Sequence, residues 1–506
     1  MKRKYSIFLF LVFLFSHSCV FAQKDSVRFT LSFEKAAMHQ VHVSMNCRVQ
    51  SNAPVIFKMP QWTPGYYQIM NYASFVSNFR AEDEKSRLLE WKKINTNTWE
   101  VTTGNSKIVH LNYDVLANKA FVANSVVDTD HAYLTPASVF LYIDHQLQRP
   151  VLLTIQPYNS WHRIASGLDS VSYNRFSAPG FDILYDCPIL AGDLEEFPSF
   201  TVKGIPHRFI AYKPGTFDQT ALMNDLKKIV ETATKTIGDI PYKQYCFLGI
   251  GPGRGGIEHL SSSAVSFDGT ELKTAGDKKR MLNFLAHEYF HNYNVKRIRP
   301  VELGPFDYDN GSKTRQLWIS EGWTVYYEFL LLKRSGITSD SDLYKDIQTN
   351  ILAYEKHNGK LHQSLAASSE ETWSDGPFGN DPEKTISYYN KGPVVALMFD
   401  FAIRHFTKNK YSIDDVLRRL YNEYYKKGNR GFTEAEFKTV CQAVAHNKMT
   451  ELFEYVYTTK ELDYKKYFNY GGLNINVADG SFQIHPLPQP DNLQSAILKT
   501  WLKGKF

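Results

Sequence analysis

Apolar and polar residues alternate over much of the first 200 positions of the chain. A two-residue period is typical of β-strands with one buried face. The stretches that follow it are Val27 to Phe33, Val41 to Met45, Thr98 to Thr103 and Ile108 to Val115. Turn-forming residues such as Pro64, Gly65 and Gly104 separate them. The pattern predicts an antiparallel β-rich domain over residues 23–203.

The pattern changes to helical spacing from residue 204 onward. A capping-box form at Thr216 opens an apolar helical stretch that stops at Gly238, and similar forms begin at Ser412 and Thr433. Residues 204–470 are therefore predicted to form a mainly helical domain with a small sheet. Residues 471–506 form a short C-terminal extension interrupted by prolines. The predicted class is α+β, with a β-rich domain preceding a helical one.

Two of the predicted helices carry candidate chemistry. The first, residues 279–291, has an apolar stripe at helical spacing and ends in an H-E-x-x-H motif, His287 to His291. The second is predicted from Ser320, as N-cap, to Ser335, with Gly336 as the stop. It would place Glu321 in its first turn.

The H-E-x-x-H motif suits a zinc ion. On a helix, His287 and His291 lie one turn apart on the same face, and Glu288 can take a proton from metal-activated water. A catalytic zinc usually has three protein ligands, and Glu321 is the best candidate for the third. The alternative is that these are ordinary helix histidines and a surface glutamate, because so short a motif also arises by chance.

Length and charge narrow the function without identifying it. The chain has 506 residues, enough for two or three domains with a large core. Its formal net charge is +6, and Lys2, Arg3 and Lys4 supply three of those charges within a segment expected to be removed. The remaining charge is too weak and too dispersed for a nucleic-acid partner.

Residues 1–22 have the form of a secretory signal peptide. A basic start precedes an apolar run from Ile7 to Phe15, and Val20 to Ala22 resembles a cleavage site before Gln23. The alternatives are an uncleaved anchor, or a lipid anchor at Cys19, which Ser16 disfavours because an apolar residue is expected there. We expect an exported protein, periplasmic or secreted, without stable membrane insertion after cleavage.

The cysteines that follow the signal peptide suggest no metal site of their own. They are Cys47, Cys187, Cys246 and Cys441. Their wide spacing contains no C-x-x-C pair. Export permits disulfides, but we favour buried thiols.

Longer motifs around these residues resemble the M61 glycyl aminopeptidases. The segments are Trp62 to Tyr66, His287 to Pro300, Leu303 to Tyr308 and Leu317 to Tyr327. The resemblance covers most of the chain after the signal peptide. It implies a thermolysin-like gluzincin domain that binds Zn²⁺, with Glu321 as the third ligand. Many members carry a C-terminal PDZ domain, for which the residues after Gly471 are too few.

The same resemblance suggests residues that bind the substrate. Gly255 to His259 resembles the exopeptidase motif G-x-M-E-N, in which Glu258 would bind the free α-amine while Gly255 and Gly256 allow close backbone approach. Tyr388 to Gly392 resembles the Y-x-K-G segment, in which Tyr389 would support the oxyanion, with Tyr388 as the second choice.

Together these expectations describe an exported zinc aminopeptidase. Its substrates would be peptides with a free N-terminus, and the resemblance implies glycine and alanine as the residues removed. The alternatives are an aminopeptidase of broader specificity, an endopeptidase, or a non-catalytic peptide-binding protein on the same scaffold. Glu328 lies two turns beyond Glu321 and would either orient a zinc histidine or face solvent.

Overall fold

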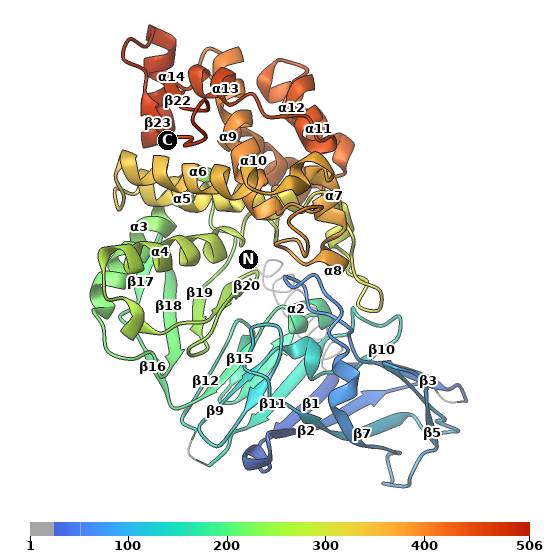
Figure 1. The fold of residues 1–506 in the computed structure, drawn as a ribbon. Helices are drawn as coiled ribbons and strands as arrows, with labels where there is room; N and C mark the ends of the chain where they lie inside the picture. Colours follow the sequence, from blue (N-terminus) through green and yellow to red (C-terminus); the bar gives the residue numbers. More distant parts are fainter. Residues whose placement is uncertain (1–24, 51, 160, 506) are drawn as a thin grey trace, which may run out of the picture. The chain divides into compact units, whose positions relative to one another are not determined.

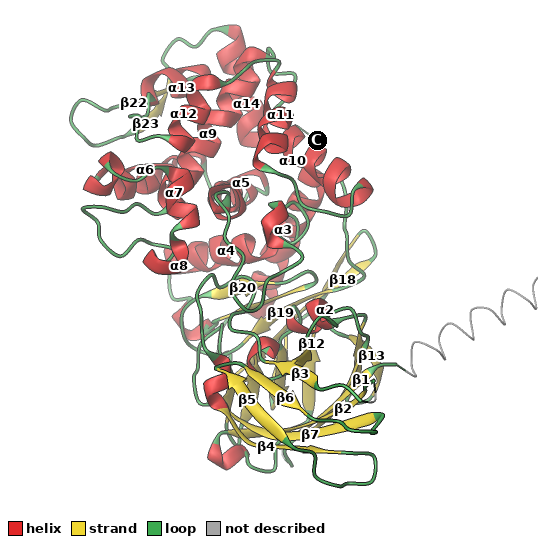
Figure 2. Cartoon of the chain, turned by 90° about the vertical axis from the view of Figure 1, so that its right-hand side faces the viewer, coloured by secondary structure: helices red, strands yellow, loops and turns green. Residues whose placement is uncertain are grey.

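The computed structural model describes residues 25–50, 52–159 and 161–505, so the predicted signal peptide and Cys19 lie outside the described residues. Two compact units make up the chain (Figure 1). The N-terminal unit runs to Glu195 and includes residues 211–213 and 253–255. The C-terminal unit contains residues 196–210, 214–252 and 256–506. Strands dominate the first unit and helices the second (Figure 2), which confirms the predicted α+β class.

The described residues of the N-terminal unit form three sheets. The largest has seven strands in the order β13-β14-β11-β1-β2-β7-β4, and two four-stranded sheets have the orders β10-β3-β6-β5 and β12-β15-β9-β8. The strands of the largest sheet are β1 (Val27–Ser32), β2 (Gln40–Arg48), β4 (Val76–Glu82), β7 (Ile108–Leu116), β11 (Val151–Gln156), β13 (Asp169–Ser172) and β14 (Arg175–Ala178). The others are β3 (Val55–Lys58), β5 (Trp91–Asn95), β6 (Thr98–Val101), β8 (Val126–Val127), β9 (His131–Leu134), β10 (Tyr142–Ile143), β12 (Arg163–Ser166) and β15 (Ile189–Gly192).

The predicted antiparallel arrangement of the N-terminal unit is wrong for one pair of strands. β1 pairs with β11 in parallel, with Val27 opposite Val151, while β1 and β2 pair antiparallel. A parallel pair requires a long crossover, and here more than a hundred residues separate the two strands. Local alternation predicted β1 but cannot reveal a partner that is so distant in sequence.

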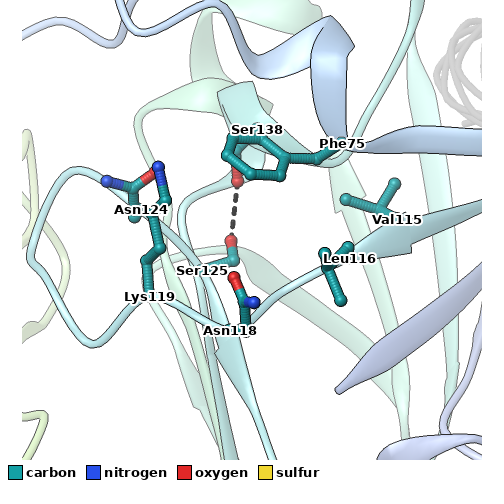
Figure 3. Close-up of a pocket in the computed structure, with 8 residues that line it drawn as sticks. All are labelled: Phe75, Val115, Leu116, Asn118, Lys119, Asn124, Ser125 and Ser138. Atoms are coloured by element: carbon teal, nitrogen blue, oxygen red, sulfur yellow. Dashed lines mark hydrogen bonds between the residues drawn. The ribbon is translucent and has the colours of Figure 1, made fainter. Parts of the chain in front are cut away.

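The N-terminal unit contains a small pocket beside β7 (Figure 3). Its lining residues are Phe75, Val115, Leu116, Asn118, Lys119, Asn124, Ser125 and Ser138. The Ser125 and Ser138 hydroxyls are hydrogen-bonded at 2.7 Å, and the Lys119 ammonium lies 4.6 Å from the centre of the Phe75 ring. The side chains of Ser125, Ser138 and Lys119 are thus engaged with one another or with an aromatic face.

A mixed sheet stands at the start of the C-terminal unit. Its main order is β16-β18-β19-β21-β20, and β17 pairs with β18. The strands are β16 (Leu194–Glu196), β17 (Phe200–Val202), β18 (Ile205–Tyr212), β19 (Tyr245–Gly249), β20 (Gly256–Glu258) and β21 (Ser262–Val265). β19 and β21 run parallel, and β20 returns antiparallel to β21 as an edge strand. An edge strand keeps one row of backbone groups unpaired.

Helices form the rest of the C-terminal unit. They are α3 (Gln219–Ile237), α4 (Ala275–Phe290), α5 (Thr324–Arg334), α6 (Asp340–Glu355), α7 (Leu365–Glu370), α8 (Thr372–Asp375), α9 (Tyr388–Phe406), α10 (Ile413–Leu420), α11 (Glu434–Ala445), α12 (Thr450–Tyr457), α13 (Tyr464–Tyr470) and α14 (Asn492–Lys503). A short hairpin, β22 (Leu473–Ile475) and β23 (Ile484–Pro486), precedes α14. Among the described residues, the N-terminal unit adds the short helix α2 (Phe181–Tyr185).

The capping boxes predicted at Ser412 and Thr433 are present, whereas α3 is capped by Asp218 rather than Thr216. Cys47, Cys187, Cys246 and Cys441 form no disulfide with one another, and each is buried, as predicted. Within the described part of the chain, no helix has the length and apolar character needed to cross a bilayer.

Candidate metal centre

Helix α4 presents the H-E-x-x-H motif at its C-terminal end. A capping box formed by Thr274 and Asp277 starts the helix, five residues before the predicted segment. Leu282, Leu285 and Phe290 are buried, and they fix which face of the helix points to the interior. His287 and His291 both lie on a buried face as a result. The local sequence thus sets the register of the two histidines.

The side chains of His287, His291 and Glu321 converge. One potential ligand atom from each lies within 4.8 Å of the others. The two Nε2 atoms are 2.9 Å apart, and Glu321 Oε2 lies 3.5 Å from that of His287 and 3.2 Å from that of His291. Two imidazole nitrogens and one carboxylate oxygen form a typical donor set for a catalytic zinc.

Hydrogen bonds at the other ring nitrogen set the tautomer of each histidine. His287 Nδ1 donates to Glu328 Oε2 at 2.8 Å, and His291 Nδ1 donates to the Asn294 carbonyl at 2.8 Å. A carbonyl only accepts, so the Nδ1 of His291 carries the proton. Both Nε2 lone pairs are then left to face Glu321. Glu328 therefore orients a histidine, the first of the two alternatives that its spacing allowed.

Glu321 reaches the cluster from a wide turn of helix. Residues Trp318–Trp323 form a π-helix that continues directly into α5, so the predicted N-cap at Ser320 is wrong. Ser320 lies inside the helix and is fully buried. The N-cap prediction failed because a π-turn has no local signature comparable to a capping serine.

Close packing of two glycines lets the helix of Glu321 approach α9. A Cβ atom on Gly322 would lie 2.6 Å from the Cα of Gly392. The space between the two backbones is therefore too small for any side chain at position 322. Asn294 also contacts the helix of Glu321, because its side-chain amide donates to the Ile319 carbonyl at 2.8 Å and to Thr324 Oγ1 at 3.0 Å. The segment after the second histidine is therefore tied to the turn that carries Glu321.

Glu288 is buried beside the three convergent residues. Burial raises the pKa of its carboxyl to about 7, and the two histidines only partly offset this effect. The backbone of Gly256 packs against this carboxyl, since a Cβ atom at that position would lie 2.5 Å from it. A carboxyl with a pKa near neutrality can both accept and return a proton.

Glu258 ends the edge strand β20, opposite Ser263 of β21. Its side chain is buried. Its charge raises the pKa of Glu288 and of His291, which places it within electrostatic range of the cluster. Gly256 begins the same strand. Gly255 lies just before it in the left-handed region, with a φ of 91°.

The two candidate tyrosines at the start of α9 point in different directions. The Tyr389 hydroxyl donates to Glu321 Oε2 at 2.9 Å. The Tyr388 hydroxyl instead pairs with Thr372 Oγ1 at 3.1 Å, deep in the core. Only Tyr389 therefore contacts one of the three convergent residues.

The cluster has an excess of negative charge. Burial opposes protonation of His287, but the Glu321 and Glu328 carboxylates outweigh it and raise its pKa well above the ordinary value. Burial likewise opposes ionisation of Glu321, but the two histidines hold its pKa well below the usual range. A cation held between the three ligand atoms would satisfy the same need for positive charge. The residues present thus fit a divalent metal in donor type, convergence and charge.

Three residues of the site were not predicted from the sequence. Asn294 and Thr324 join the two metal-ligand segments, and Phe378 packs beside Tyr389 with its ring centre 5.4 Å away. Asn294 follows His291 by three residues, a spacing that suits a bond back to the end of a helix. Nothing in the sequence near Phe378 indicates its neighbour.

Comparison with known proteins identifies relatives of both units. Residues 28–193 match the family model of the peptidase M61 N-terminal domain, and residues 280–395 match that of the M61 glycyl aminopeptidases. Comparison with curated protein sequences gives no match.

Several solved structures share the fold. An aminopeptidase N family protein from Idiomarina loihiensis is 26% identical with a TM-score of 0.84, over 89% of this chain and 79% of that chain. A mutant M1 zinc metallopeptidase from Deinococcus radiodurans, bound to a Tyr-Ser-Ala substrate, is 13% identical with a TM-score of 0.52, over 87% and 94%. Legionella pneumophila aminopeptidase A, in complex with aspartic acid, is 12% identical with a TM-score of 0.52, over 86% and 49%.

Proposed function

The chain belongs to the M61 peptidase family and is a metallopeptidase, and from this premise we propose that it is a zinc aminopeptidase that removes small N-terminal residues from peptides. The observation that carries the proposal is the convergence of His287, His291 and Glu321 within 4.8 Å, with both Nδ1 atoms already engaged. Glu288, buried next to them, supplies a proton acceptor.

His287, His291 and Glu321 would hold the zinc ion. When bound, zinc supplies a Lewis acid that polarises the scissile carbonyl and makes water a nucleophile near neutral pH. Glu328 and the Asn294 carbonyl keep the two imidazole rings in the required tautomer and orientation.

Glu288 is the proposed general base. Its carboxyl is buried, and its pKa of about 7 suits a group that takes a proton from water and then gives it to the leaving amine. The close approach of Gly256 limits the positions that this carboxyl can adopt. The same glycine thus serves both the strand that receives the substrate and the base.

Glu258 is the proposed anchor for the free α-amine. Its carboxylate is buried near the ligand cluster, where a substrate ammonium would bind it by charge-assisted hydrogen bonds. β20 is an edge strand, so its free backbone groups are available to an extended peptide. This anchor is what would distinguish an aminopeptidase from an endopeptidase.

Tyr389 is the proposed hydrogen-bond donor to the oxyanion. Its hydroxyl is 2.9 Å from Glu321 Oε2, at the edge of the ligand cluster where a substrate carbonyl oxygen would approach. A preorganised donor of this kind typically contributes about 10²–10³ in rate. Tyr388, whose hydroxyl pairs with Thr372, has no such access.

The preference for glycine and alanine rests on the similarity to the glycyl aminopeptidases. The decisive experiment measures cleavage of free dipeptide amides with varied first residues, with zinc content determined on the same sample. We expect one zinc per chain, fastest turnover of glycyl and alanyl substrates, and loss of activity with a chelator. Equal cleavage of N-acetylated peptides would overturn the Glu258 assignment. A protein without zinc and without metal-dependent hydrolysis would overturn the enzymatic proposal.

Export is a separate part of the proposal, supported by the charged start, apolar run and cleavage-site pattern of residues 1–22. The mature protein is expected in the periplasm or the medium with Gln23 at its N-terminus. Cell fractionation followed by N-terminal sequencing checks both points. A retained Met1, or a lipid on Cys19, would contradict cleavage at this site.

A further inference from the structure

Phe378 is an exposed aromatic residue next to the proposed active site. It lies between α8 and α9, and 68% of its surface is exposed. Its ring centre is 5.4 Å from that of Tyr389, with a 34° angle between the planes. Tyr389 in turn donates to Glu321. The apolar surface of Phe378 is therefore separated from the ligand cluster only by the side chain of Tyr389.

The backbone of Phe378 is coupled directly to Tyr389. The Ser387 hydroxyl caps α9 by accepting from the Tyr389 amide at 3.2 Å. The same hydroxyl donates to the carbonyl of Pro377, the residue before Phe378, at 2.8 Å. One serine thus holds the two aromatic residues in a fixed relation.

Other contacts hold the rest of the segment in place. Thr385 Oγ1 donates to the Asp381 carbonyl at 2.8 Å, and the Gly359 amide donates to the Pro382 carbonyl at 2.9 Å. Gly359 also packs directly on the backbone of Thr385, where a Cβ atom would lie 2.1 Å from the carbonyl oxygen. The exposed ring is therefore displayed on a well-supported loop.

A single exposed apolar residue is common on protein surfaces and by itself indicates nothing. Phe378 differs because it combines exposure, a supported backbone and contact with Tyr389, the proposed donor to the oxyanion. Aromatic rings placed in this way bind apolar ligand groups at little cost in conformational entropy.

We propose that Phe378 forms one wall of the subsite for the second residue of the substrate and selects peptides with an apolar side chain at that position. The inference rests on the proposed function, in which Glu258 binds the α-amine. A glycine or alanine in first position has no side chain long enough to use this ring. The next Cα is about 3.8 Å further along an extended peptide, so the second side chain is the first that can reach it.

The test compares glycyl dipeptide amides that differ only in the second residue, namely leucine, phenylalanine, serine and asparagine. For the wild type we expect kcat/KM to be about tenfold higher with the apolar residues. Phe378→Ser should remove that preference by raising KM for the leucine and phenylalanine substrates, with kcat and the serine and asparagine substrates little changed. Phe378→Leu should retain most of the preference.

Leu361 offers a matched control in the same unit. It is 63% exposed and ends the short helix Asn358–Leu361. Leu361→Ser should leave all four kcat/KM values unchanged, since it deletes a comparable exposed apolar group. An equal loss on all four substrates after Phe378→Ser, or no loss on any, would overturn the inference.

The outcomes also separate this inference from the proposed function. Efficient cleavage of every free glycyl substrate, without preference at the second position, would leave the aminopeptidase intact and remove Phe378 from specificity. Cleavage confined to N-acetylated peptides would instead remove the amine anchor. The same Phe378→Ser comparison on the blocked series, varied at the residue after the cleaved bond, would then decide the role of the ring.

Discussion

Two buried clusters of charge lie on the same helical segment and solve the problem of buried carboxylates differently. The first contains Glu321 and Glu328, with His287 and Glu288 of α4 and its C-cap His291. The second lies further along α5, where Arg334, Tyr326 and Tyr327 meet two aspartates of the neighbouring helices. Continuous helix connects the two, from Trp318 to Arg334.

The second cluster carries its own counter-charges. Arg334 donates to both oxygens of Asp414 at 3.1 Å, and Arg404 donates to Asp400 at 2.9 Å. Each carboxylate also accepts from a tyrosine hydroxyl. Tyr326 donates to Asp400 at 2.8 Å, and Tyr327 donates to Asp414 at 2.6 Å. The indole of Trp501, on the C-terminal helix α14, donates to the Tyr326 hydroxyl at 2.7 Å. This cluster joins α5, α9, α10 and α14 without need of a ligand.

The first cluster has histidines where the second has arginines. An arginine is permanently charged and donates to its partner carboxylate, so the carboxylates of the second cluster have their counter-charge within the protein. A histidine, unlike an arginine, can release its proton and offer a nitrogen lone pair to a metal, so an external cation can replace the protons that the carboxylates of the first cluster hold on its histidines. The comparison of the two clusters shows that buried carboxylates alone do not mark a reactive site. Buried carboxylates that have no arginine or lysine as a partner do mark one.

The largest expected effect comes from removing the base in the first cluster. Glu288→Gln should lower kcat/KM for a glycyl amide by about 10²–10⁴, because the proton acceptor is lost. Zinc content should stay at the wild-type level, since His287, His291 and Glu321 are intact. Steady-state kinetics and metal analysis on one sample check both points. Substantial remaining turnover would remove Glu288 from this role.

Disrupting the second cluster should lower the free energy of unfolding without changing the zinc content of the protein. Arg334→Met leaves Asp414 buried without its bidentate partner, and such a loss costs about 3–5 kcal/mol. Chemical denaturation should show this decrease, while the zinc content of the folded protein is unchanged. The double variant Arg334→Met/Asp414→Leu should recover part of the loss. A loss of zinc at full stability would show that the two clusters are not separate.

A third prediction concerns a buried cation that belongs to neither cluster. Lys391, two residues after Tyr389, is fully buried, and its ammonium has no hydrogen-bond partner among the described residues. It lies 5.4 Å from the centre of the Tyr354 ring. Burial lowers its pKa to about 8, and Glu355 only partly opposes this.

The sign of the pH effect follows from that lowered pKa. The unfolded chain binds a proton at Lys391 up to its ordinary pKa of 10.5, whereas the folded protein releases it from about pH 8. The free energy of unfolding should therefore rise between these values, by up to about 3 kcal/mol. In Lys391→Met the free energy of unfolding should no longer rise over this pH range, and the variant should be more stable than the wild type at pH 7. Chemical denaturation of both proteins at pH 7 and pH 9.5 tests this prediction. An equal change in the free energy of unfolding of the two proteins would contradict it.

The smallest effect is expected for the residue that orients His287. Glu328→Ala should weaken zinc binding about 10- to 100-fold, because the ring loses the acceptor that fixes its tautomer. Glu328→Gln retains an acceptor oxygen and should retain part of the affinity. Competition with a chelator of known affinity measures both variants. Unchanged affinity in Glu328→Ala would make the contact incidental to metal binding.

The parts of the fold that follow from local pattern were predicted well. Strand alternation identified β1, β2 and β7, and capping residues identified the starts of α10 and α11. The errors fell where distant contacts decide the outcome. The parallel pairing of β1 with β11 joins strands more than a hundred residues apart, and the π-helix at Trp318–Trp323 replaced a predicted N-cap.

The candidate site divides in the same way. His287, Glu288 and His291 lie within one helical turn, so their spacing alone places them together. Tyr388 and Tyr389 could not be separated by sequence, and the rotation of α9 in its packing decided that Tyr389 meets Glu321 while Tyr388 meets Thr372. The contact between Phe378 and Tyr389 depends on a loop conformation that no short motif records.

The sequence by itself therefore determined the helix that presents two histidines and a glutamate on a buried face, since a period of 3.6 residues is a local property. The tertiary structure alone decided which carboxylates have an arginine partner and which face the histidines. Charge pairing in the interior depends on contacts such as Arg334 with Asp414, eighty residues apart. Burial then turns the unpaired set into a place for a cation, because desolvated carboxylates are stable only with a positive charge beside them.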